Sequence, residues 1–413
     1  MGLDVEASSA EERKRLQSET TDKLHERAWG CFTSAHKFCR NVCPVTQATM
    51  NENYSPTAFH ANVVAMEQGD LSIEDVAEDY IGCTMCGACE LRCPNTLFTG
   101  DFYRNRTRTV DVVKAMRALA VDSGVHQPKW QRWVELTTER KNEPVVEGNT
   151  QEHVRDWADG LDLPVGGPTI LFVDCEAAFY RTELPRAVAL ILKTAGVEFG
   201  LMREQWCCGG PALELGYVKE SRYLAEHNLA DWRAVGVKRI ITLDPHDYIS
   251  FTEDYPAFFG DEYEMEIIHI TELVAELIRD GRLQLTVPVQ RTATYHDPCR
   301  LNKRKGIYES PREILRSIPG LTFKDVDHVT QWSYCSGAGG GMRIERPDIA
   351  DKISQQRMDR VAELEVDTLV SACVWSERPL AERGQERNPQ IDVRDLMEMV
   401  AQAAGIDYRG ADA

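Results

Sequence analysis

Four cysteines near residue 90 have the spacing of an iron-sulfur ligand run. In the stretch IGCTMCGACELRCPN, the pattern CxxCxxCxxxCP is formed by Cys83, Cys86, Cys89 and Cys93. Thiolate sulfur is the ligand that iron-sulfur clusters require, and two-residue gaps let three cysteines wrap three corners of one cubane. A zinc ribbon would need a second, well-separated CxxC pair and would not explain the following proline. The run therefore predicts a [4Fe–4S] cluster.

An incomplete run precedes it in WGCFTSAHKFCRNVCPV, residues 29–45. This run also ends with a cysteine, three residues and a Cys-Pro pair. In two-cluster ferredoxins the cysteine before the proline binds the cluster of the other run. We therefore expect two clusters. The first would be held by Cys31, His36, Cys39 and Cys93, and the second by Cys43, Cys83, Cys86 and Cys89.

His36 is the unusual member of the first set. A regular run would have cysteines at the positions of Thr33 and His36. Imidazole is an established nitrogen ligand in clusters of the Rieske type, and a neutral ligand makes the site less negative. The first cluster should therefore be easier to reduce than the second. The alternatives are a three-iron cluster with His36 merely nearby, or a His36 that faces solvent.

A second group of cysteines recurs in two copies. In the first copy the landmarks are Cys175, Cys207, Cys208, Asp244 and Asp247. At nearly the same spacing, the second copy has Cys299, Cys335, Ser336, Cys373 and Ser376. Agreement over several landmarks predicts an internal repeat.

The thiols of each copy suggest a further metal centre. In the first copy Cys175, Cys207 and Cys208 could be completed by Asp244, His246 or Asp247 to hold a small cluster or a single metal ion. In the second copy three corners of a cubane could be held by Cys299, Cys335 and Cys373. The alternative in each copy is a set of buried cysteines that pack as small apolar side chains. Because the glycine run 337–342 follows a candidate ligand, we expect its amides to point at cluster sulfur rather than at a nucleotide.

The elements that must position these residues change in kind along the chain. Apolar residues recur at helical spacing over 55–80 and 104–124. Later, buried strands expected at 168–175, 238–244, 290–299 and 366–373 alternate with helices, which favours parallel α/β layers. The predicted fold class is α+β and multidomain. An all-helical, two-cluster ferredoxin-like domain would span 1–165, and two repeated cysteine-rich α/β modules would span 166–285 and 286–413.

Composition narrows the function. The 47 basic and 66 acidic residues give a net charge of -19, which argues against a nucleic-acid or anionic-lipid surface. No apolar run reaches the roughly 20 residues of a transmembrane helix, and the N-terminus is polar rather than a signal peptide. The 13 cysteines would be unusual as disulfides in a reducing compartment, so metal ligation is the better interpretation. We expect a cytoplasmic protein that associates with membranes only through partners.

The chain has two ligand runs followed by two copies of a cysteine-rich module, and this order resembles the CCG-domain iron-sulfur oxidoreductase family. The most specific segments are WCCGGPALELG and YHDPCRLNKRKGIYESPREIL. The chain is similar to the heterodisulfide reductase catalytic subunit and to the iron-sulfur subunits of glycolate oxidase and anaerobic glycerol-3-phosphate dehydrogenase. The resemblance implies an electron-transfer subunit with two [4Fe–4S] clusters. Its partners would be a flavin-containing dehydrogenase or electron-transfer flavoprotein, and a quinone-reducing membrane subunit.

Each copy departs from this family by keeping only three of its five thiols. Oxygen ligands at Asp244, Asp247, Ser336 and Ser376 are poor substitutes for thiolate on iron-sulfur iron. A relay of electrons between a flavoprotein and a quinone, membrane partner or disulfide is therefore the first hypothesis. The alternatives are a catalytic reductase of a heterodisulfide or sulfur substrate, and a scaffold whose metal-free modules bind partners.

Overall fold

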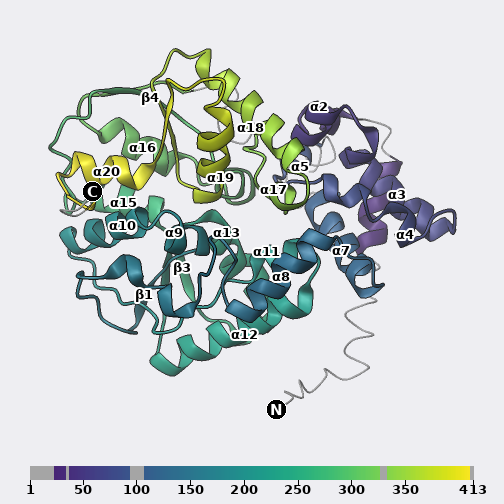
Figure 1. Cartoon of the computed structure of the whole chain (residues 1–413), viewed down its shortest axis with the longest axis horizontal. Helices are drawn as coiled ribbons and strands as arrows, with labels where there is room; N and C mark the ends of the chain where they lie inside the picture. Colours follow the sequence, from purple (N-terminus) through teal and green to yellow (C-terminus); the bar gives the residue numbers. More distant parts are fainter. Residues whose placement is uncertain (1–22, 34–36, 94–106, 326–332, 410–413) are drawn as a thin grey trace.

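A computed structural model describes residues 23–33, 37–93, 107–325 and 333–409. Figure 1 shows a helical part, purple to blue, beside two stacked α/β parts, one teal and one green to yellow. Helices α17 (Met342–Glu345) and α18 (Pro347–Ala362) of the last part lie against the helical part. The helical part and the two α/β parts agree with the predicted mixed fold class, and the ferredoxin-like relation of the first part stays a prediction.

The helical part comprises short helices around a small core. Its α-helices include α2 (Pro44–Thr49), α3 (Pro56–Gln68), α4 (Ile73–Val76), α5 (Ala88–Arg92), α7 (Thr109–Asp122) and α8 (Pro128–Arg140). Ser55 caps α3 by accepting a hydrogen bond from the Ala58 amide, and Gly69 ends it in the left-handed conformation. Helices α3 and α7 pack together through Phe59, Val113 and other buried apolar residues.

The first α/β part has a three-stranded parallel sheet. Its strands β1 (Thr169–Phe172), β2 (Arg239–Thr242) and β3 (Glu266–His269) lie in the order β1-β2-β3. The helices are α9 (Cys175–Phe179), α10 (Glu183–Thr194), α11 (Gly210–Glu214), α12 (Val218–Val235), α13 (Pro245–Ile249), α14 (Tyr255–Phe259) and α15 (Ile270–Arg279). Cys175 and Asp244 each follow the carboxyl end of a strand. Parallel strands therefore bring these two landmarks to the same edge of the sheet.

The second α/β part repeats this plan with four parallel strands in the order β5-β4-β6-β7. The strands are β4 (Arg291–Tyr295), β5 (Leu321–Phe323), β6 (Thr368–Ser371) and β7 (Asp392–Asp395). Besides α17 and α18, the helices are α16 (Glu309–Ser317), α19 (Val374–Pro379) and α20 (Leu396–Ala403). Cys299 follows β4 and Cys373 follows β6, so the candidate ligands again lie at strand ends.

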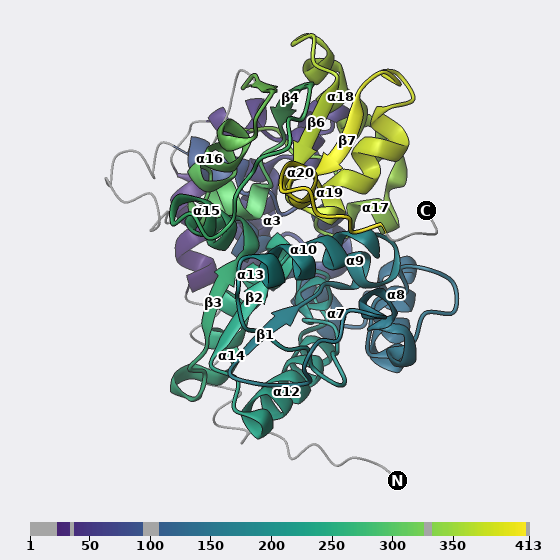
Figure 2. The same cartoon turned by 90° about the vertical axis from the view of Figure 1, so that its left-hand side faces the viewer.

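The two α/β parts share one hydrophobic core. Helix α10 packs on α20 and α15 packs on α16, which places these four helices between the two sheets (Figure 2). One buried cluster contains side chains of both parts, including Val188, Leu273, Ile314 and Val400. At its border Glu176, which is fully buried, pairs with Arg343 and Arg378 of the other part. The repeats are therefore joined through both an apolar core and buried ion pairs.

Candidate iron-sulfur and metal sites

The four cysteines expected for the second cluster come together in the structure. A single cavity is lined by Cys43, Cys83, Cys86 and Cys89. Cys43 stands directly before α2, and Gly87, with φ of 70°, turns the chain between Cys86 and Cys89. Glycine adopts this left-handed conformation without steric cost, which lets the run wrap around one point.

Burial raises the pKa of three of these four thiols. It raises the pKa of Cys43 to about 11 and that of Cys83 to about 12. A buried thiolate is unfavourable unless a positive charge compensates it, and iron ions supply that charge. Four thiols around one cavity, two of them buried and two half-buried, thus fit a [4Fe–4S] cubane, a centre that takes up and releases single electrons.

The cysteines of the first set are neighbours as well. Burial, followed by the charges of Cys39 and Cys93, raises the pKa of the Cys31 thiol to about 12. The Cys39 thiol lies 3.5 Å from the Thr57 hydroxyl. His36 lies outside the described residues, so its part in the first cluster stays a prediction.

The second α/β part reaches directly into the second ligand run. Cys335 shares a buried cluster with Cys43 and Cys86, and Cys299 packs against it. A hydrogen bond with Cys335 lowers the pKa of the Cys86 thiol to about 6. Thiols that belong to different parts of the chain are therefore in contact.

The glycine run 337–342 makes this approach possible. A Cβ atom at Gly340 would overlap the carbonyl oxygen of Cys83, and one at Gly339 would crowd the carbonyl oxygen of Thr84. Only residues without side chains let the two backbones lie this close. In addition, the Gly337 amide donates to the Cys335 sulfur at 3.3 Å. The expected contact of the amides with cluster sulfur stays a prediction.

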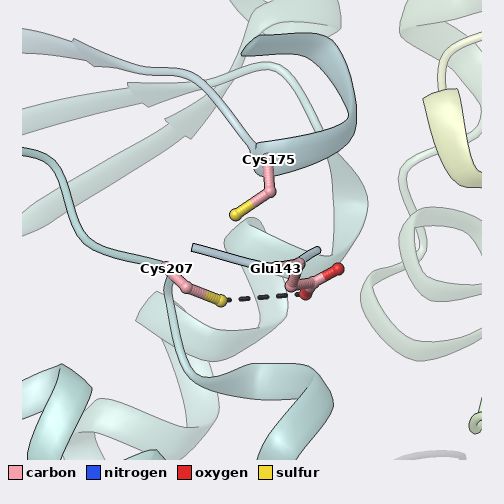
Figure 3. A group of neighbouring side chains, drawn as sticks. All are labelled: Glu143, Cys175 and Cys207. Carbon is pink, nitrogen blue, oxygen red and sulfur yellow. Dashed lines mark hydrogen bonds between the residues drawn. The ribbon is translucent and has the colours of Figure 1, made fainter. Parts of the chain in front are cut away.

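In the first α/β part a carboxylate joins two of the predicted thiols. Figure 3 shows Cys175, Cys207 and Glu143, whose ligand atoms lie within 4.8 Å of one another. The Cys207 thiol donates to Glu143 Oε1 at 3.7 Å, and the other carboxylate oxygen is buried without a described hydrogen-bond partner. Burial, followed by the charge of Glu176, raises the pKa of Glu143 to about 8. These three groups could hold a single divalent metal ion.

Sequence reasoning missed Glu143 because it belongs to the loop after α8 and has no motif around it. Backbone contacts place it: the Cys207 amide donates to the Lys141 carbonyl at 2.7 Å, and the Asn149 side chain donates to the Glu143 carbonyl at 2.9 Å. The first of these contacts joins two segments that lie far apart in the sequence, and the second holds the loop around Glu143 in place. No local pattern in the sequence indicates them.

The other predicted oxygen and nitrogen ligands divide between two places. Asp247 lies beside Cys208, and burial together with that thiol raises the pKa of the Asp247 carboxyl. Asp244 and His246 instead form a second group with Cys373, also within 4.8 Å. His246 Nδ1 lies 2.7 Å from Asp244 Oδ1. The structure thus groups Asp244 and His246 with a thiol of the other repeat, rather than with Cys175 and Cys207.

The two serines of the second copy form a hydrogen bond with each other. Ser336 donates to Ser376 across 3.0 Å in a buried position. Cys299 lies beside Cys335, and it is also an electrostatic neighbour of Cys373. The described structure therefore pairs the two serine hydroxyls and makes Cys299 a neighbour of the other two thiols of this copy.

Comparison with known proteins agrees with this arrangement. Residues 29–97 match the 4Fe-4S dicluster domain, and residues 169–251 and 293–375 each match the cysteine-rich domain called CCG. Together the matches cover more than half of the chain. The chain therefore belongs to the CCG-domain family of iron-sulfur oxidoreductase proteins.

Within this family the chain is similar to a dihydromethanophenazine:CoB–CoM heterodisulfide reductase subunit from Methanosarcina mazei. The two are 28% identical over 87% of this chain and 86% of the relative. The probable iron-sulfur-binding oxidoreductase FadF of Bacillus subtilis is 27% identical over 83% of this chain. The EtfAB:quinone oxidoreductase of Syntrophomonas wolfei is 29% identical over 82%. This chain covers 48% of each of the latter two.

A solved structure shares the fold. A hypothetical protein from Helicobacter pylori superimposes with a TM-score of 0.59 at 12% identity, over 96% of this chain and 75% of that one. The family places the chain as an iron-sulfur subunit with an electron-transfer role in an oxidoreductase complex. Among the described helices, none is both long enough and apolar enough to cross a bilayer.

Proposed function

We propose that the chain relays electrons between a flavoprotein and a downstream acceptor, which is a quinone, a membrane partner or a disulfide. The contact between Cys86 and Cys335 carries this proposal. It connects the ligand run of the helical part to the thiols of the second α/β part without an intervening layer of protein. Electron transfer is efficient only between closely spaced centres, and this contact supplies the short step.

The thiols of the proposed centres form a continuous series. Cys39 of the first set is an electrostatic neighbour of Cys89 in the second set. From there the series continues through Cys86 and Cys335 to Cys299. The first set would thus face one partner and the second α/β part would face the other. In the proposed division into a ferredoxin-like domain at 1–165 and modules at 166–285 and 286–413, the series begins in the first of these domains and ends in the last module.

The relatives suggest what the partners are. One relative is named for an electron-transfer flavoprotein and a quinone, and another belongs to a heterodisulfide reductase. We infer a flavin-containing dehydrogenase or electron-transfer flavoprotein on one side, and a quinone-reducing membrane subunit on the other, with this chain on the cytoplasmic face. The net charge of -19 favours protein partners over nucleic acid.

A second candidate is catalytic reduction of a heterodisulfide by this chain itself. Similarity to the heterodisulfide reductase relative over most of the chain favours it. The hydrogen bond between Ser336 and Ser376 weighs against it, because these oxygens occupy positions where the family has thiols. We therefore rank the relay first.

The test uses the full chain, purified and reconstituted without oxygen. We expect at least about eight irons and a similar amount of sulfide, as two cubanes require. We also expect reduction by a reduced electron-transfer flavoprotein, followed on the visible absorption of the clusters. Cys86→Ser should halve the iron content and stop electron passage beyond the first cluster. Robust turnover of a heterodisulfide by the purified chain alone would support the second candidate instead.

A further inference from the structure

Arg117 is a buried cation that forms no ion pair with a carboxylate in the described part of the chain. It lies on α7 and is 3% exposed. In the described part of the chain, no carboxylate lies within ion-pair distance of its guanidinium. The Glu214 carboxylate pairs with Arg300 and acts on Arg117 only as a more distant charge. One face of the guanidinium lies over the ring of Trp130, 4.4 Å from the ring centroid.

The guanidinium donates only to backbone carbonyls, and these come from all three parts of the molecule. It donates to the Tyr80 carbonyl at 2.8 Å, just before the second ligand run, and to the Cys83 carbonyl at 3.0 Å within that run. It also donates to Glu214 of the first α/β part and to Gly340 of the second, both at 2.9 Å.

Each of these acceptors is close in sequence to a candidate ligand. Cys83 is itself a predicted ligand, Glu214 ends the helix that follows the Cys207-Cys208 pair, and Gly340 belongs to the glycine run after Cys335. Close packing holds the arrangement in place, because Cβ atoms at Gly216 and Gly340 would overlap the backbones of Arg117 and Cys83, respectively.

A buried cation without a counter-charge carries a large desolvation cost that carbonyl dipoles repay only in part. Next to Arg117 lies the cavity lined by the four cysteines of the second set. A cubane with four thiolate ligands has a net negative charge, which increases when the cluster takes up an electron. The buried positive charge of Arg117 therefore lies beside the site proposed for the negatively charged second cluster.

We propose that Arg117 is a positioning residue that supplies the counter-charge of the second cluster and raises its reduction potential. A fixed positive charge stabilises the reduced, more negative form more than the oxidised form. Because the same guanidinium binds the carbonyls of Glu214 and Gly340, this potential depends on both α/β parts being docked. The inference rests on the proposed second cluster at Cys43, Cys83, Cys86 and Cys89.

The experiment compares Arg117→Gln and Arg117→Lys with wild type in the reconstituted full chain. Redox titrations are followed by low-temperature electron paramagnetic resonance on the signal that Cys83→Ser abolishes. For Arg117→Gln we expect the equilibrium constant for reduction to fall about tenfold, which equals 59 mV for a one-electron couple. Arg117→Lys keeps the charge on a different donor geometry, so its constant should stay within about threefold of wild type.

The matched control is Arg312→Gln. Arg312 is also buried, but it pairs with Asp297 at 2.7 Å within the second α/β part. Arg312→Gln removes a buried guanidinium but should leave the reduction potential of the second cluster unchanged. An unchanged potential in Arg117→Gln would overturn the inference. If Arg117→Gln does not retain the cluster, Arg117→Lys provides the test. A tenfold fall in the equilibrium constant for reduction in Arg117→Lys would then overturn the inference. A wild-type protein without the second signal would refute the proposed function instead.

Discussion

At the residue scale, the chemistry of this chain depends on buried thiols that have neighbours of their own kind. Burial raises the pKa of Cys31 and Cys83 to about 12, so each keeps its proton at neutral pH unless metal displaces it. Loading of the proposed clusters should therefore release protons. The type of each ligand also affects the reduction potential of a cluster, because a neutral ligand leaves the site less negative than a thiolate does.

His36 provides the corresponding prediction. If imidazole is the fourth ligand of the first cluster, His36→Cys adds a negative charge and should lower the reduction potential of that cluster, whereas His36→Ala should lose or convert its signal. Redox titration by electron paramagnetic resonance measures both. Should His36→Ala keep both cluster signals at their original potentials, the histidine is not a ligand.

Ligand sets differ in how much the sequence alone can indicate about them. The spacing of Cys83, Cys86 and Cys89 within one loop determines their geometry locally, so the sequence suffices to group them. Glu143 approaches Cys207 only through backbone contacts between distant segments. Asp244 and His246 approach Cys373 only because the two repeats face each other. Contacts of this kind result from tertiary packing, which leaves no local pattern.

At the scale of elements, short helices and glycine turns bring the three parts into contact. Runs of buried branched residues predict four strands, and these correspond to β1, β2, β4 and β6. The same pattern does not predict β3, β5 and β7, because charged or half-buried residues such as Glu266 and Asp392 interrupt the apolar runs there. The three strands without a predicted counterpart all lie at sheet edges, whereas the edge strand β1 keeps a buried apolar run and is predicted.

The packing of α3 on α7 makes a pH-dependent contribution to stability. His60 of α3 is 1% exposed and its Nε2 lies 3.0 Å from the Thr109 hydroxyl on α7. Burial, followed by the charge of Arg27, lowers the pKa of His60 from 6.5 to about 3. The unfolded chain therefore binds a proton below pH 6.5 that the folded chain does not bind, and stability falls as the pH falls from 6.5 towards 3.

We expect wild type to lose about 1.4 kcal/mol of unfolding free energy through this group for each pH unit below about 6.5. His60→Gln should remove that part of the pH dependence. Denaturant unfolding at about pH 7.5 and about pH 5.5 gives the comparison, and His153→Gln, at an exposed position, is the control. Equal slopes with pH in wild type and His60→Gln would contradict the prediction.

The glycine run yields a second prediction for an element. Gly340→Ala places a Cβ against the Cys83 carbonyl and forces an alanine to φ of 61°. Gly281→Ala imposes a similar conformation, with φ of 71°, but meets no atom within 4 Å. Unfolding free energies should therefore fall in both variants, with an additional loss of about 1–3 kcal/mol in Gly340→Ala from the overlap. Equal losses would show that the loop has room to move away.

At the scale of the whole molecule, the two α/β parts behave as one body because they share a core and buried charges. Glu176 is fully buried between Arg343 and Arg378, at 3.2 and 2.8 Å. Arg181 similarly reaches Glu377 and Glu398 across the same border. Since these pairs connect the repeats, their loss should affect the unfolding of both.

Glu176→Gln leaves two partly buried arginines without their shared carboxylate. We expect a loss of about 3–5 kcal/mol in the free energy of unfolding, with both repeats still unfolding in a single transition. Glu382→Gln removes the exposed partner of Arg378 and should cost less than about 1 kcal/mol. Calorimetry distinguishes these outcomes, and two separate transitions in wild type would show that the repeats are independent.

The core between the two sheets also limits how such a chain can be recombined. Each repeat supplies two of the four helices that fill it, namely α10 and α15 from one and α16 and α20 from the other. A chimera that takes only one repeat from a relative would combine two helix surfaces that were never selected to pack together. Grafts made at the border between the helical part and β1 avoid this mismatch, so the repeat pair is the unit that homologous exchange should preserve.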